Sequence, residues 1–132
     1  AIDHANFWVG KVPEKFVNRE FYQFNKTNIL MRTNAEEYDV LGRIMAERLN
    51  DAKGRFAVII PKLGFSEHTK RMTHDLNSRE IGPWDQPTID AVFTQSLRRH
   101  LKSGQIDELD LHINDPRFAD ACFVTFLELI KS

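Results

Sequence analysis

The stretch that decides the fold is FAVII at residues 56–60, where five apolar residues follow one another without alternation. A strand of a parallel sheet with helices on both of its faces has this pattern. The stretch lies between two segments of helical periodicity. One starts after Asn34 and ends at Gly54, and the other starts at Pro87 and ends at Gly104. Residues 56–60 therefore predict a central parallel strand.

The rest of the chain continues this alternation. Residues 7–9 and 28–32 are short apolar runs typical of strands, and residues 109–113 alternate as a strand with one wetter face. A third amphipathic helix is expected after Asp115 and Pro116. We expect residues 1–132 to form one α/β domain, a three-layer, Rossmann-like fold with a mostly parallel sheet and helices on both faces.

Composition narrows the class of protein. The formal net charge is -1, with 42% hydrophobic and 28% charged residues, which indicates a folded domain and argues against nucleic acid as a partner. Cys122 is the only cysteine, so a reducing compartment is favoured. No apolar run is long enough to span a bilayer, and no signal peptide is recognisable. We expect a soluble, cytoplasmic protein with no membrane partner.

Polar residues follow three of the predicted strands. In an open parallel sheet, ligands bind beyond the carboxyl ends of the strands. This rule selects the turns at residues 32–34, 62–66 and 112–115, and the long polar loop at residues 62–86 belongs to the same hypothesis. The candidate ligand-binding residues are Arg32, Thr33, Gly64, Ser66, His112, Asn114 and Asp115.

Each candidate also has a structural interpretation. Gly64 allows close approach of an anion or simply makes a turn, and His112 is a base, a ligand contact or an exposed side chain. For Asp115 a helix cap is favoured over a ligand contact. Ser66 and His112 also permit a hydrolase, the weakest hypothesis, because no G-x-S-x-G elbow surrounds Ser66. Whether the chain is an enzyme stays open.

Cofactor motifs are missing from the sequence. It contains neither a G-x-G-x-x-G fingerprint nor a G-x-x-x-x-G-K-[ST] loop, so no complete nucleotide site is expected in this chain. His68 and His74 lack a recognised metal-ligand spacing, and no structural metal is expected.

Several stretches together carry a family resemblance. They are residues 1–7, 12–16, 30–33 with 36–37, 61–66, and 112–116 with 118–119. In this order they resemble the C-terminal half of the uncharacterised protein family related to the ATP-binding, replication-inhibiting domain of the tomato mosaic virus resistance protein. The sequence departs from the family pattern at Gly64, where the family usually has two adjacent glycines and this chain has Leu63 before the glycine.

The resemblance implies a two-domain protein in which a Rossmann-like N-terminal half precedes this chain, with a cleft between the halves and a homo-oligomer. ATP or another nucleotide would then be bound mainly by the missing N-terminal half. The first hypothesis is a ligand-binding half-domain that contributes its strand ends to a cleft for a small anionic ligand. The alternative is an interaction or dimerisation module with no ligand of its own.

Overall fold

The computed structural model describes residues 1–131, and the chain divides into two units. Unit 1 consists of residues 1–33 and 67–86, and unit 2 consists of residues 34–66 and the chain from Pro87 onward. Each unit is therefore built from two separate segments of sequence.

Unit 1 contains a five-stranded sheet in which every neighbouring pair is antiparallel, in the order β1-β3-β2-β5-β6. The strands are β1 (His4–Trp8), β2 (Phe21–Gln23), β3 (Asn28–Arg32), β5 (Met72–His74) and β6 (Glu80–Pro83), with short 3-10 helices η1 (Glu14–Phe16) and η2 (Glu67–Lys70). Its core is formed by Phe21, Ile29 and Met31, and Phe7, Val12 and Phe16 pack against them.

The expected mostly parallel, Rossmann-like sheet is wrong. The larger sheet is antiparallel, and the one parallel pair within the described residues forms a separate two-stranded sheet. No long helix separates β1, β2 and β3, and strands joined without such a crossover pair antiparallel. The expected loop at residues 62–86 also contains β5 and β6, which extend this sheet.

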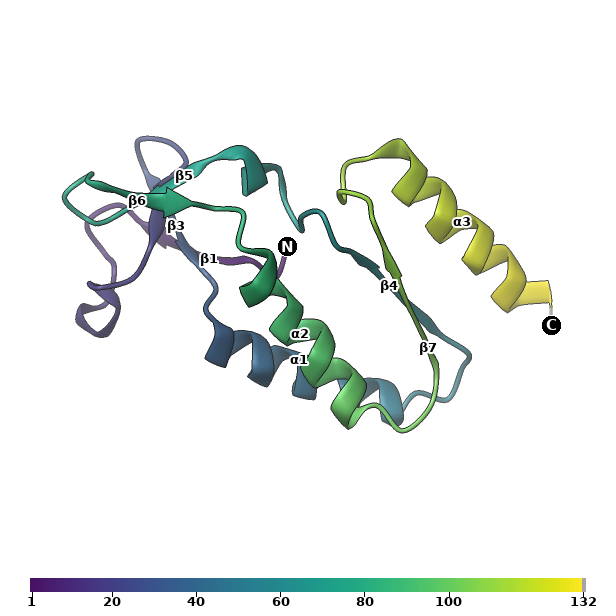
Figure 1. The fold of residues 1–132 in the computed structure, drawn as a ribbon. Coiled ribbons are helices and arrows are strands. Elements are labelled where there is room, and N and C mark those ends of the chain that lie inside the picture. The colour runs from purple at the N-terminus through teal and green to yellow at the C-terminus, as the bar shows by residue number, and fades with distance from the viewer. Residues whose placement is uncertain (132) are drawn as a thin grey trace. The chain divides into compact units, whose positions relative to one another are not determined.

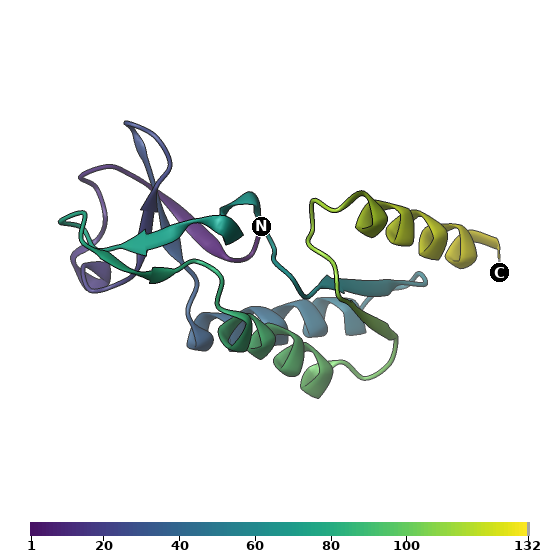
Figure 2. The ribbon, with the colours of Figure 1, turned by 45° about the horizontal axis from the view of Figure 1, so that its top comes forward.

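Unit 2 carries the long helices. Its elements are α1 (Ala35–Asn50), β4 (Ala57–Pro61), α2 (Pro87–His100), β7 (Gln105–Leu109) and α3 (Pro116–Lys131). The two strands pair in parallel, from Ala57 opposite Gln105 to Pro61 opposite Leu109. Figures 1 and 2 show α1 and α2 side by side on one side of this pair and α3 on the other.

The start of α1 follows from its sequence. Asn34 Oδ1 accepts a 2.9 Å hydrogen bond from the Glu37 amide, and Glu37 Oε2 accepts one of 3.0 Å from the Asn34 amide. These two reciprocal bonds form a capping box at the predicted helix start after Asn34. Thr33 does not take part, since its hydroxyl donates to the Ile2 carbonyl. Asn34 is therefore the N-cap residue that sets the start of α1.

Helices α1 and α2 touch at Gly42. A Cβ atom placed there would lie 2.6 Å from the Phe93 carbonyl oxygen and 2.9 Å from the Leu97 amide nitrogen. Only a residue without a side chain permits this approach, because real Cβ atoms do not come so close to backbone atoms.

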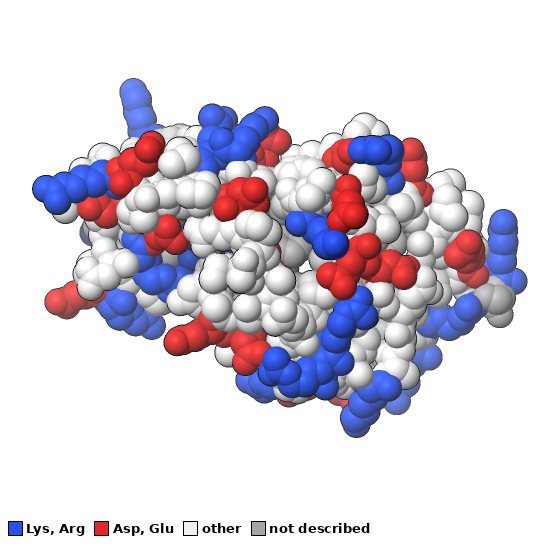
Figure 3. Space-filling view, in the orientation of Figure 1, with Lys and Arg blue, Asp and Glu red and all other residues white. Residues whose placement is uncertain are grey.

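The surface in Figure 3 mixes basic and acidic side chains, without a large area of one sign on the visible face. Among residues 1–131, no helix combines the length and hydropathy that crossing a bilayer requires.

Candidate functional site

The carboxyl ends of β4 and β7 bring two of the predicted turns together. The ladder continues beyond the strands, because the Lys62 amide donates to the Leu109 carbonyl at 2.9 Å and the Leu63 amide donates to the Leu111 carbonyl at 3.1 Å. The Ile113 amide then donates to the Gly64 carbonyl at 3.1 Å. Loops 62–66 and 110–115 therefore form one edge of unit 2, which carries Gly64, Ser66, His112, Asn114 and Asp115.

His112 fastens the two loops to each other. Its Nε2 lies 2.9 Å from the Ser66 carbonyl oxygen, and its Nδ1 accepts a 3.1 Å hydrogen bond from the Asn114 amide. Since Nδ1 is the acceptor, the geometry places the ring proton on Nε2, which donates to Ser66. This bond uses the backbone of Ser66 and gives no support to a nucleophile and base pair.

Asp115 occupies the N-terminus of α3. Its Oδ1 accepts from the Arg117 amide at 2.9 Å, as the predicted helix cap requires, and its Oδ2 lies 2.7 Å from an Arg117 guanidinium nitrogen. Hydrogen bonds from the Arg117 side chain, and then from its amide, lower the pKa of Asp115 to about 2. The carboxylate already fills the place that an anionic ligand would take at this helix end.

The backbone amides of residues 62–64 all donate hydrogen bonds to carbonyl groups of the chain itself. The Gly64 amide donates to the Pro61 carbonyl at 3.3 Å, and the two preceding amides are used by the β7 side of the ladder. Gly64 has a φ of 140°, which the turn needs. The Lys62 ammonium pairs with Asp110 at 2.9 Å, and this hydrogen bond raises the pKa of Lys62. The backbone of residues 62–64 is thus a tight turn and does not form a phosphate cradle.

Arg32 and Thr33 lie in unit 1, where their side chains bond to the segments that contain Trp84 and Ile2. Arg32 Nε donates to the Trp84 carbonyl at 3.0 Å, its guanidinium lies 5.4 Å from the centre of the Trp84 ring, and the Thr33 hydroxyl donates to the Ile2 carbonyl at 2.8 Å. Trp84 is 1% exposed and donates its indole N–H to Asp3 at 3.0 Å. Both predicted residues therefore have structural roles in this unit.

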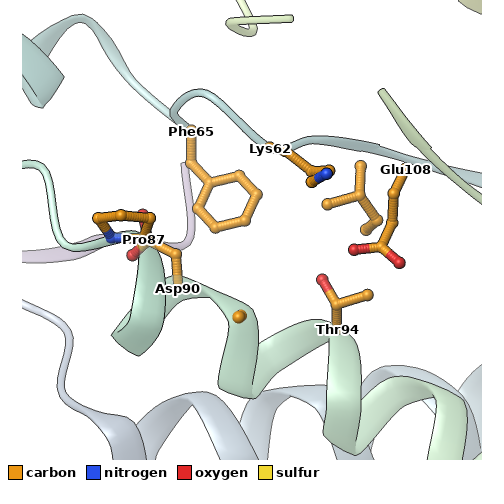
Figure 4. A pocket seen from close by; sticks show the side chains of 8 residues that line it. Lys62, Phe65, Pro87, Asp90, Thr94 and Glu108 are labelled. Atoms are coloured by element: carbon orange, nitrogen blue, oxygen red, sulfur yellow. The ribbon is translucent and has the colours of Figure 1, made fainter. Parts of the chain in front are cut away.

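A small cavity in unit 2 was missed by the sequence analysis. It has a volume of about 100 Å³ and lies between β4, β7 and α2 (Figure 4). Its walls are formed by Ile60, Lys62, Phe65, Pro87, Asp90, Ala91, Thr94 and Glu108. The available signal was the spacing of positions 87, 90, 91 and 94, which puts them on one face of α2.

Two side chains of opposite charge, Lys62 and Glu108, line this cavity. In Figure 4 the Lys62 and Glu108 side chains lie on the strand side, and Thr94 lies on the helix side. Glu108 Oε2 pairs with Arg98 at 2.9 Å, and Lys62 pairs with Asp110. Within residues 1–131, no group of three or more His, Cys, Asp or Glu side chains has an arrangement suited to a metal ion.

Comparison with known proteins agrees with the resemblance noted in the sequence. Residues 1–130 match the family described as "Uncharacterised protein family (UPF0261) C-terminal domain". A UPF0261 protein of Rhizobium meliloti is 33% identical over 98% of this chain and 31% of its own length. A UPF0261 protein of Mesorhizobium japonicum is 34% identical over 99% of this chain and 32% of its own length. The ToMV resistance protein Tm-1 of Solanum lycopersicum is 30% identical over 98% of this chain and 16% of its own length. The chain thus spans about a third of the length of these bacterial relatives.

Proposed function

Since this chain belongs to the uncharacterised protein family UPF0261, as its C-terminal domain, we propose that it is the ligand-binding part of a longer protein. The proposed site lies at the joined ends of β4 and β7 and includes the cavity beside them. The observation that carries the proposal is the convergence of loops 62–66 and 110–115 next to that cavity. Arg32 and Thr33 stay outside it, because their side chains bond within unit 1.

The proposed ligand is a small anion with a short apolar body. Ile60, Phe65 and Ala91 line the cavity with apolar groups, and Lys62 is the basic residue among its lining residues. An anionic group that replaces Asp110 as the partner of Lys62 would place its apolar body against Phe65. The Thr94 hydroxyl and the Glu108 carboxylate add hydrogen-bonding groups for a polar ligand atom.

The volume of the cavity limits the size of the ligand that it can hold. Sites for drug-sized molecules measure roughly 300–1,000 Å³, and a water molecule takes about 30 Å³. A volume of about 100 Å³ suits a short-chain carboxylate and is too small for a whole nucleotide. If the longer protein binds ATP, we propose that residues outside this chain make most of the contacts.

Thermal shift measurements test the proposal, because a ligand that binds only the native state raises its stability. The probes are butyrate, inorganic phosphate and ATP, each at matched ionic strength. We expect butyrate to raise the Tm more than phosphate does, and ATP to give no larger shift than phosphate.

Two variants locate the site. Lys62→Gln should abolish the butyrate shift, and Asp110→Asn should increase it by releasing Lys62 from its present partner. Lys53→Gln is the matched control, since Lys53 is an exposed lysine that does not line the cavity. A butyrate shift that survives Lys62→Gln, or no shift with any probe, would rule out this site.

A further inference from the structure

Helix α3 carries an apolar stripe that is largely exposed within residues 1–131. Ala119, Phe123, Phe126 and Ile130 recur at helical spacing, and the three large side chains are 61%, 55% and 61% exposed in that order. Phe118, Cys122, Thr125 and Leu129 form a second, more buried side of the helix, consistent with its contact with β4. The exposed stripe is therefore separate from the side that α3 uses within unit 2.

A stripe of this kind is unusual for a surface. Large apolar side chains that are exposed singly are common, whereas a contiguous exposed group marks a contact surface. Asp120, Glu128 and Lys131 lie on the third side of the helix, so α3 already has a charged face for solvent. The stripe is thus a second apolar face on a helix that has its polar face elsewhere.

The two-stranded sheet of β4 and β7 also has open edges in the part of the chain that the structure describes. Within residues 1–131, β4 and β7 have only each other as neighbours. Parallel strands normally lie inside larger sheets that helices cover on both faces, and isolated two-stranded sheets are marginally stable. Val58, Ile59, Ile106 and Leu109 are apolar strand residues that remain only half-buried.

We propose that the α3 stripe and an open edge of the β4–β7 pair are covered by a strand and helix from elsewhere in the same, longer polypeptide. The relatives are about three times the length of this chain, so such a protein has ample sequence to supply them. A parallel strand followed by a helix would extend the sheet and bury the stripe together.

A second copy of the chain fits the strand edge less well. In a twofold dimer an edge strand meets the same strand of its partner, and the two run antiparallel. That arrangement would end the parallel sheet at the interface and would leave the half-buried faces uncovered. The pairing direction of β4 and β7 thus favours the polypeptide itself as the occupant.

The test uses the full-length protein that carries this chain. Phe123→Asp and Phe126→Asp together place two charges in the stripe. Val124→Asp is the matched control, because Val124 is 53% exposed and lies among the charged residues of the third side. We expect the double variant to lower the Tm by several degrees and to speed amide exchange in α3, while the control stays within about a degree of wild type.

The outcomes separate the possibilities. Equal Tm values for the double variant and the control would show that the stripe faces solvent, and would overturn the proposal. So would a full-length dimer, measured by sedimentation, that the double variant converts to monomers of undiminished Tm, because a second copy would then be the occupant. Neither Lys62 nor the cavity takes part in this test, so its result is independent of ligand binding.

Discussion

The hydroxyl of Tyr38 on α1 donates a 2.9 Å hydrogen bond to Oδ1 of Asp90 on α2. Tyr38 is 0% exposed and Asp90 is 9% exposed, so the bond crosses the buried contact between the helices. The Tyr38 ring also packs against Phe65 and Phe93. Tyr38 thus links α1 to the helix that forms one wall of the cavity.

Removal of this hydroxyl should destabilise the protein. Tyr38→Phe keeps the ring and deprives a buried carboxylate of a donor, so we expect the free energy of unfolding to fall by about 1–3 kcal/mol in urea titrations. Tyr22→Phe is the control, because Tyr22 packs through its ring and no hydroxyl bond of Tyr22 occurs within residues 1–131. Equal losses for the two variants would contradict a special role for the Tyr38 bond.

Loss of the His112 ring should loosen the joined loops. His112→Ala removes the bonds to the Ser66 carbonyl and the Asn114 amide, and we expect a loss of about 1–2 kcal/mol with faster amide exchange at Ile113. Leu63→Ala is the control, since that side chain is 55% exposed and its backbone bond is kept. If exchange at Ile113 is unchanged in His112→Ala, the ring does not hold the loops.

Gly42 gives a test in which two effects have opposite signs. Alanine in a helix interior is normally favoured over glycine by about 1 kcal/mol. At Gly42 the added methyl group would press on the backbone of α2, so we expect Gly42→Ala to destabilise the protein by about 1–3 kcal/mol. Gly54→Ala is the control, because nothing lies within 4 Å of its added carbon. A stabilised Gly42→Ala would mean that the helices are further apart than described.

The lowered pKa of Asp115 predicts that the stability of the protein depends on pH. The pKa of Asp115 in the folded protein is about 2, below the ordinary 3.8, because Arg117 donates hydrogen bonds to the ionised form. A carboxyl group whose pKa is lowered by folding stabilises the folded protein at pH values above its ordinary pKa. This contribution to stability is lost as the pH falls from about 4 to about 2. Carbon-detected NMR titration should show the Asp115 pKa rising toward 3.8 in Arg117→Gln and staying low in Arg98→Gln. A low pKa in both variants would assign the shift to another cause.

Local signals in the sequence predicted the helices well. Asn34 with Glu37, Pro87, and Asp115 with Pro116 mark helix starts through side-chain bonds and backbone geometry that involve neighbours only, and the structure confirms all three starts. The ends were less accurate, since α1 ends at Asn50 and not at Gly54. Fraying and local turns decide the last residues of a helix.

The sheet depended on contacts that periodicity does not encode. Residues 56–60 correctly indicated a parallel strand, but its predicted central position is wrong, because β4 pairs only with β7 within residues 1–131. Strands β5 and β6 are only three and four residues long, and β5 pairs with β2, which lies far away in sequence. The strand expected at residues 109–113 lies instead at 105–109, where pairing with β4 sets its register. The joined loops of the candidate site were predicted from strand direction, whereas the cavity also needed the position of α2.

The interleaving of the two units affects how the chain emerges from a ribosome. Strand β2 pairs with β5 through Phe21 and His74. One edge of β2 therefore stays unpaired until about 50 further residues have been translated. At roughly 5–20 residues per second this wait lasts on the order of several seconds. During that time β2 presents unpaired backbone groups to other nascent chains. Translational pauses between residues 33 and 72 should therefore promote aggregation, and pauses after β6 should not.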